Sequence, residues 1–118
     1  MAISGELEAY VIERLEAAGF EVRSRRMFGG VGIYLDETFC ALMAPDDGGL
    51  YFKTDDSNRA DYERAGAKPF KPFEGRTTVM SYYRVPEEVI EDGDALQGWA
   101  RKARAAALAA PRKRRGGA

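Results

Sequence analysis

Three short apolar segments between residues 31 and 53 constrain the fold more than any other part of the sequence. They are rich in β-branched and aromatic residues, as strands usually are. Asp36-Glu37 separates the first two segments, and the turn-forming stretch PDDGG at residues 45–49 separates the last two. Strands joined by such short turns pair antiparallel, so the region predicts a β-meander. The predicted strands are residues 31–35, 38–43 and 50–53.

Helical periodicity precedes this region. Apolar residues that recur at intervals of three and four predict a helix that begins after Ser4 and ends at Gly19. Ser4 is a suitable N-cap, and a glycine is a common residue at a helix C-terminus. The apolar stripe of this helix consists of Leu7, Tyr10, Val11, Leu15 and Ala18.

Two further strands and a short helix follow from the same rules. Residues 20–22 alternate, and residues 77–85 are rich in β-branched and aromatic residues, so both are predicted strands. A short helix is expected over residues 57–65, with Asp55 or Asp56 as its cap.

Helices are also predicted after the last strand. Pro86 suits the first position of a helix, and Asp94 with Gln97 resembles a capping box. Strands and helices that are segregated in this way predict the α+β class. We therefore expect a two-layer sandwich, with an antiparallel sheet of about five strands and the N-terminal and C-terminal helices packed on it. The apolar face of the last helix consists of Leu96, Trp99, Ala103 and Ala107.

The predicted strand at residues 38–43 is apolar on both faces. Simple alternation places Phe39, Ala41 and Met43 on one face, and Cys40 and Leu42 on the other. A sheet with one solvated face alternates more cleanly. The second face is therefore expected to be covered, by the chain itself or by a partner, which hints at a dimer or a docking surface.

The composition removes much catalytic chemistry. The sequence has no histidine and one cysteine, Cys40. A Ser-His-Asp or Cys-His nucleophile is thereby excluded, as is a zinc site of the usual kind. The acidic pairs lack the spacing of a calcium loop. We expect no enzyme activity, no cofactor and no bound metal, and we expect Cys40 to be a buried core residue.

Charge divides the chain into two unequal parts. Residues 1–100 hold all 19 acidic and 11 of the 18 basic residues, a net charge of −8, whereas residues 101–118 carry +7. We expect one domain over residues 1–110 and a basic tail over residues 111–118. The tail is a candidate nucleic-acid contact or a solubilising end. Its clustered charges are Arg112, Lys113, Arg114 and Arg115.

No apolar run is long enough to span a membrane, and the N-terminus does not resemble a secretory signal. The single cysteine also agrees with a reducing compartment. The expected location is the cytoplasm.

The stretch RSRRMFGG at residues 23–30 has two readings. In the first, the arginines end a strand, Met27 and Phe28 plug the edge of the core, and the two glycines permit a positive φ angle or a bulge. In the second, a partner protein docks on these residues, because arginine and aromatic side chains are enriched in binding hot spots. The proposed partner patch consists of Arg25, Arg26, Met27, Phe28, Gly29, Gly30 and Lys53.

A third reading concerns Tyr82, Tyr83 and Arg84. Aromatic and basic residues that follow one another can bind single-stranded nucleic acid. On a strand, however, Tyr82 and Tyr83 point to opposite faces, so at most one of them can join a stacking platform.

Three longer stretches carry a resemblance to a known family. They are RRMFGGVGIYLDETFCALMAP, LYFKTDDSNRADYERAGAKPF and TVMSYYRVPEEVIEDGDALQGWARKA, and they lie in this order within residues 6–108. Together they resemble the N-terminal domain of TfoX/Sxy competence regulators. Full-length regulators carry a second, C-terminal domain, so the chain is similar to a short, single-domain relative. The resemblance implies a two-layer α/β fold with an antiparallel sheet.

The resemblance also implies a role without catalysis. Bacterial regulators of this type promote the expression of DNA-uptake genes together with the cyclic-AMP receptor protein. We therefore expect a non-enzymatic regulatory module that acts through contact with a protein of the transcription machinery. A homodimer, direct DNA contact and a small-ligand-binding module remain alternatives.

Overall fold

A computed structural model of the chain describes residues 5–27, 29–45, 48–70 and 81–110. Ser4, Phe28, the first part of the strand predicted over residues 77–85, and the basic residues of the tail lie outside the described residues. The elements in chain order are α1 (Gly5–Ala17), β1 (Val22–Met27), β2 (Gly30–Leu35), β3 (Thr38–Met43), β4 (Leu50–Lys53), α2 (Arg59–Arg64), β5 (Tyr82–Arg84), α3 (Glu87–Glu91) and α4 (Gly93–Ala109).

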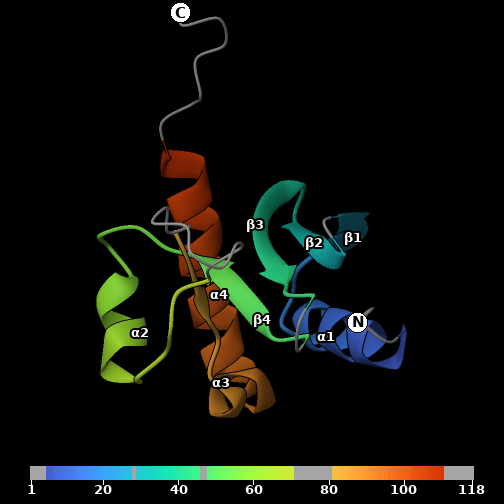
Figure 1. Ribbon diagram of the computed structural model, residues 1–118, viewed down its shortest axis with the longest axis horizontal. Coiled ribbons are helices and arrows are strands. Elements are labelled where there is room, and N and C mark those ends of the chain that lie inside the picture. The colour runs from blue at the N-terminus through green and yellow to red at the C-terminus, as the bar shows by residue number, and fades with distance from the viewer. Residues whose placement is uncertain (1–4, 28, 46–47, 71–80, 111–118) are drawn as a thin grey trace, which may run out of the picture.

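The five strands form one antiparallel sheet in the order β1-β2-β3-β4-β5, with every strand paired to its neighbour in the chain. The helices near both ends of the chain lie against this sheet. Figure 1 shows α4 running past β4, α3 at its N-terminal end, and α1 beside β1 and β2. The predicted α+β class and its antiparallel meander are thereby confirmed. None of the helices in the described segments is long and apolar enough to cross a membrane.

The core lies between the sheet and the helices. α1 contributes Val11 and Leu15, and α4 contributes Leu96 with a row of alanines. Small alanine side chains let α4 lie close to β3 and β4, where Phe52 is fully buried. Cys40 is also fully buried, as predicted.

The predicted apolar stripe of α1 is only partly buried. Val11, Leu15 and Ala18 enter the core, whereas Leu7 and Tyr10 are 37% and 43% exposed. The N-terminal half of α1 therefore extends beyond the sheet that its C-terminal half covers.

Polar side chains tie the helix layer to main-chain carbonyl groups. The Arg14 Nε atom of α1 donates to the Ile90 carbonyl at 3.0 Å, and Gln97 Nε2 of α4 donates to the Ala18 carbonyl at 2.7 Å. Arg104 of α4 donates to the Leu35 and Asp36 carbonyls at the β2–β3 turn. These bonds satisfy carbonyl groups at the ends of elements, where the regular hydrogen-bond ladders stop.

Two predicted helix caps are wrong. The last helix is capped by Asp92, whose side chain accepts hydrogen bonds from the backbone N–H groups of Asp94 and Ala95. Gln97 is then two residues too far along to close a capping box, and its side chain instead donates to the Ala18 carbonyl just after α1. Gly19, by contrast, ends the first helix with φ +106° as predicted.

The cap predicted for the short helix also fails. α2 begins after Asn58, not after Asp55 or Asp56, and no side chain caps it. The Asp55 carboxylate is engaged by the backbone and hydroxyl of Ser57, and Asn58 accepts from the Asp55 backbone. These side chains build a turn before the helix, which leaves α2 shorter than the predicted residues 57–65.

The first and last strands differ from their predicted ranges. β1 pairs with β2 along its whole length, from Val22 to Met27, so the strand continues through the arginines beyond residues 20–22. As the end strand of the sheet it tolerates polar side chains, because it packs against one neighbour only. Among the described residues, the last strand is confined to Tyr82–Arg84. Its two tyrosines point to opposite faces, as predicted, because they pair with Lys53 and Phe52 respectively.

A bulge in β3 overturns the predicted alternation of that strand. Ile33 pairs with Ala41, but the next residue of β2, Tyr34, pairs with Phe39, so Cys40 is an extra residue. An extra residue shifts the side-chain alternation by one position. Ala41 and Met43 therefore face the helices, and Phe39 lies on the opposite face with Leu42.

The core contains one unsatisfied polar group in the described part of the chain. Tyr62 of α2 is 1% exposed, and its ring packs against Trp99 with 4.6 Å between centroids. Its hydroxyl has no hydrogen-bond partner. A buried hydroxyl without a partner loses its hydration and gains nothing in return.

We therefore predict that Tyr62→Phe raises the free energy of unfolding by about 1 kcal/mol, because it removes only the unsatisfied oxygen. Urea denaturation followed by Trp99 fluorescence measures the change. Tyr62→Leu is the control: it removes the ring contact as well and should lower stability. A clear loss of stability in Tyr62→Phe would mean that the hydroxyl has a partner.

Candidate interaction surfaces

The sheet has two chemically different faces. The inner face, against which α1 and α4 pack, carries the buried residues of β2, β3 and β4. We call the opposite face the outer face. By strand register it carries Arg23, Arg25, Met27, Gly30, Gly32, Tyr34, Phe39, Leu42, Tyr51, Lys53, Tyr82 and Arg84.

Charge is sorted between the layers. The five strands contain five basic residues and no acidic one, so every carboxylate of the described residues lies on a helix or in a segment between elements. Four of the five basic residues point to the outer face. The fifth, Arg26, points to the inner face and pairs with Glu8 of α1 at 2.9 Å. The outer face is therefore the basic side of an acidic domain.

Ring side chains cluster on the outer face. Tyr34 and Phe39 have centroids 5.3 Å apart, and Phe39 lies 6.1 Å from Tyr82. The Lys53 ammonium sits 5.5 Å from the centre of the Tyr82 ring, a cation–π distance. Tyr51 and Phe70 form a second ring pair at 5.2 Å. Tyr34, Phe39, Tyr51 and Phe70 are all partly exposed.

Gly32 leaves room over β2 for the side chains of Met27 from β1 and Phe39 from β3. A Cβ atom at this position would lie 2.6 Å from Met27 Cε and 3.0 Å from Phe39 Cε1. Met27 and Phe39 therefore occupy the space that a side chain would need. Because position 32 has no side chain, Met27 of the basic strand β1 and Phe39 of the aromatic cluster can approach each other over β2.

The described residues of the predicted partner patch do not lie together on one surface. Arg25, Met27 and Gly30 lie on the outer face near one end of the sheet, whereas Lys53 lies on the same face two strands away from β2. Arg26 belongs to the inner face. Gly29 has φ +78°, which agrees with the turn reading of the glycine pair. Phe28 and the four tail residues lie outside the described residues, and the docking of a partner on this patch stays a prediction.

A hollow of about 410 Å³ opens at the end of the outer face nearest β1. Arg23, Arg25 and Tyr34 line it together with Ser24 and Glu37. The Arg23–Glu37 ion pair is long, 3.9 Å, and both side chains are about 70% exposed. Such a pair contributes little to stability, so Arg23 can turn to another anion at small cost.

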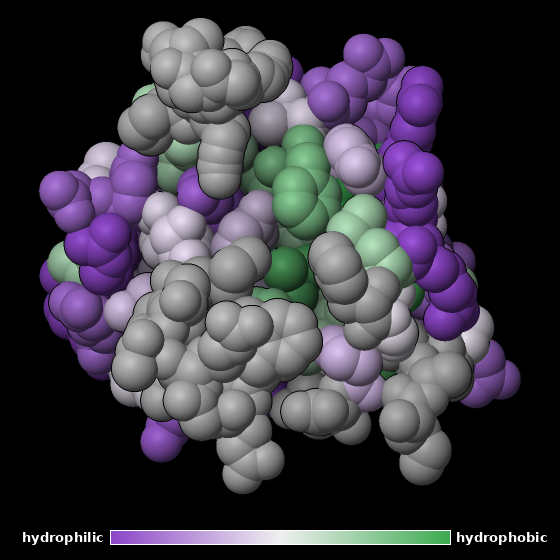
Figure 2. Space-filling model, turned by 45° about the horizontal axis from the view of Figure 1, so that its top comes forward, coloured by the Kyte–Doolittle hydropathy of each residue, from purple (hydrophilic) through white to green (hydrophobic). Residues whose placement is uncertain are grey.

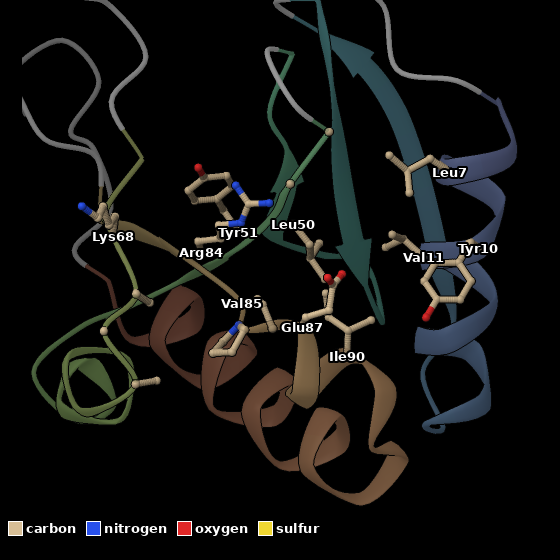
Figure 3. A pocket seen from close by; sticks show the side chains of 16 residues that line it. Leu7, Tyr10, Val11, Leu50, Tyr51, Lys68, Arg84, Val85, Glu87 and Ile90 are labelled. Atoms are coloured by element: carbon tan, nitrogen blue, oxygen red, sulfur yellow. The ribbon is translucent and has the colours of Figure 1, made fainter.

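A second groove, of about 550 Å³, lies between α1 and the segment that runs from β5 into α3. In Figure 3, Leu7, Tyr10 and Val11 form the α1 wall, Leu50, Val85 and Ile90 lie at the centre, and Lys68 lies on the far wall. Arg84 and Glu87 add charge to the lining. Apolar walls with a few charged groups are typical of binding sites of this size.

Hydrophobic residues gather on part of the molecular surface. Figure 2 shows them at the centre of one face, with strongly hydrophilic residues along its right-hand border. Leu7 and Tyr10, at the mouth of the groove, are two of the three large hydrophobic residues that are exposed in the described segments. The third, Leu108, lies at the far end of α4.

Titratable groups in the core are held in their neutral forms. Burial raises the pKa of the Cys40 thiol to about 12, and burial also raises the pKa of the Tyr62 and Tyr82 hydroxyl groups. A thiol with so high a pKa is a poor nucleophile at neutral pH. Nowhere in the described ranges do three His, Cys, Asp or Glu side chains converge as they would around a metal ion.

The fold and these surfaces define a class: a small α+β domain with a five-stranded meander, helices on one face, and ring and basic side chains on the other. The family model of the TfoX N-terminal domain matches residues 13–107, which is most of the chain. The protein belongs to the TfoX N-terminal domain family, and the resemblance found in the sequence is confirmed. No curated protein matches it significantly.

Sequence reasoning missed two groups of residues. Tyr34, Phe39 and Tyr51 were not recognised as one surface, because the bulge that turns Phe39 outward depends on pairing between strands. Leu7 and Tyr10 were assigned to the core. One available signal was the absence of acidic residues from all the strands, which marks one layer of the protein as basic.

Gly30, the second residue of the glycine pair, gives a direct test of the pairing between β2 and β3. A Cβ atom at Gly30 would lie 2.3 Å from the Met43 carbonyl oxygen, and backbone cannot move aside as a flexible side chain can. Gly30→Ala should therefore lower the free energy of unfolding by at least about 2 kcal/mol. Gly98→Ala is the control, since open space surrounds Gly98 in α4 and alanine favours helix by up to about 1 kcal/mol. Thermal melting measures both, and equal stability of Gly30→Ala and wild type would contradict the register.

The raised pKa of Cys40 predicts a loss of stability at alkaline pH. The folded protein holds the thiol proton more tightly than the unfolded chain, in which the pKa is 9.0. The contribution is therefore complete below about pH 9 and falls by up to about 1.4 kcal/mol per pH unit as the pH rises toward 12. Denaturation at a series of pH values measures the slope. Cys40→Ala should make it shallower, with the remainder due to Tyr62 and Tyr82; an unchanged slope would show that Cys40 does not titrate as inferred.

Proposed function

We propose that the protein is a non-enzymatic regulatory module that acts by contact with another protein of the bacterial transcription machinery. Membership of the TfoX N-terminal domain family is the observation that carries this proposal. The raised pKa of Cys40 supports it, because the one thiol of the chain is held in its unreactive form. By resemblance, the partner is a regulator such as the cyclic-AMP receptor protein, and the place of action is the cytoplasm.

The groove between α1 and α3 is the contact surface that the geometry supports best for a protein partner. Interface hot spots are aromatic or aliphatic side chains that fill desolvated pockets. Tyr10 and Leu7 are exposed at the mouth of the groove, next to its buried apolar residues Val11 and Leu50. A side chain of the partner that enters the groove would bury these residues together.

The groove is also built on firm elements. Leu7 lies against the turn between β3 and β4, where a Cβ at Gly48 would be 2.6 Å from Leu7 Cδ2. Arg14 ties α1 to the last residues of α3 through the Ile90 carbonyl. The α1 wall is thereby held in place before a partner arrives, which lowers the entropy cost of binding.

We predict that Leu7→Ser with Tyr10→Ser weakens binding of purified cyclic-AMP receptor protein about tenfold or more, because two anchors of the contact are lost. Immobilised full-length chain and a receptor titration measure the affinity. Leu108→Ser is the matched control, since Leu108 is 61% exposed and lies away from the groove. Equal affinity of the double variant and wild type would remove the groove from the contact, and no binding by wild type would exclude this partner.

A further inference from the structure

We propose that the outer face of the sheet binds single-stranded nucleic acid, with ring side chains that stack on bases and arginines that contact the phosphates. This goes beyond the proposed function and centres on Arg23, Arg25 and Tyr34, none of which lines the groove between α1 and α3. The face has a sheet that supports it from behind, ring side chains on neighbouring strands, and basic residues at both ends. Single strands are bound by this combination of stacking platform and positive groove.

The rings are placed as a row and not as a single contact. Tyr34 on β2 and Phe39 on β3 lie over neighbouring strands, and Tyr82 on β5 continues the row beneath Lys53. Tyr82 is only 6% exposed, so it supports its neighbours, whereas Tyr34 and Phe39 are partly exposed and can meet a base. Every base has a π-face, so such a platform tolerates many sequences.

The arginines lie where a phosphate backbone would run past Tyr34. Arg23 pairs with Tyr34 across β1 and β2, and Arg25 pairs with Gly32, so both guanidinium groups project beside the ring. The hollow of about 410 Å³ that they line with Tyr34 has room for a nucleotide. Among the described residues that line it, Glu37 alone is acidic, and the 3.9 Å contact between Glu37 and Arg23 is weak.

The negative charge of the domain does not oppose this binding at close range. The strands carry no carboxylate, and Glu8 is neutralised by Arg26 on the inner face. Charges further away than about 8–10 Å are largely screened at physiological ionic strength. The electrostatic energy of a phosphate on the outer face therefore depends mainly on its attraction to the nearest arginines.

The basic and aromatic side chains of the outer face favour single-stranded nucleic acid over two other ligands, a second copy of the chain and an acidic peptide. A second copy of the chain that paired through the same face would bring like charges together, which is unfavourable. An acidic peptide would satisfy the arginines but would leave the row of rings unused. A ligand with both phosphates and bases uses Arg23, Arg25 and Tyr34 together.

Fluorescence anisotropy of the full-length protein with a labelled oligothymidylate of about 15 nucleotides, at about 50 mM salt, tests the proposal. Wild type should bind, and affinity should fall as salt is raised. Tyr34→Ala should weaken binding about tenfold, and Tyr34→Phe should retain it because the ring remains. Arg23→Glu with Arg25→Glu should abolish binding. Arg101→Glu with Lys102→Glu, the same change of charge on exposed residues of α4, should not.

Four results would overturn the proposal. The first is a failure of wild type to bind at low salt. The second is competition by polyglutamate as effective as that by the oligonucleotide, which would show that the aromatic rings play no part. The third is binding of a duplex of the same length as tight as that of the single strand. The fourth is loss of binding when Arg112, Lys113, Arg114 and Arg115 are replaced by Gln, which would assign the binding to the tail. Circular dichroism of each variant separates loss of binding from loss of fold.

Discussion

The extra residue at Cys40 is the constraint on which the rest of the structure depends. Because β3 holds one residue more than β2 at this point, Cys40 and Ala41 are both fully buried. Phe39, one position earlier, is left on the outer face beside Tyr34. Without the bulge, either the core would lose its small residues under α4 or the outer face would lose a ring. The bulge at Cys40 thus determines both which residues enter the core and which aromatic side chains lie on the outer face.

The described acidic residues lie outside the strands, whereas the charged residues of the strands are all basic. The described carboxylates lie on the helices and in the segments between elements, and several pair with basic side chains, as Asp61 does with Arg64 and Lys102. The strands keep only basic residues, and just one of these turns inward to meet α1. A chain with a net charge close to zero therefore presents different potentials on its two sides.

Local patterns in the sequence were sufficient for much of the fold. The strands between residues 31 and 53 were found at their observed positions, because short turns and apolar runs are local signals. The caps were less predictable: Asp92 and Asp94 are both plausible, and only the direction of the chain entering α4 selects Asp92. The surfaces were hardest. Arg25 and Arg26 are adjacent in sequence but lie on opposite faces of a strand, and the phase of the sheet decides which one meets solvent beside the rings.

The arginines of β1 have a further effect, on how molecules of this protein behave toward one another. β1 is an edge strand of the sheet, so among the described elements no strand pairs with the backbone groups on its outer side. Such an edge can pair with a strand of another molecule and so start aggregation. Arg23 and Arg25, which project from this strand on the outer face, repel an identical edge that approaches it. The strand can therefore remain long and extended in a crowded cell without recruiting copies of itself into aggregates.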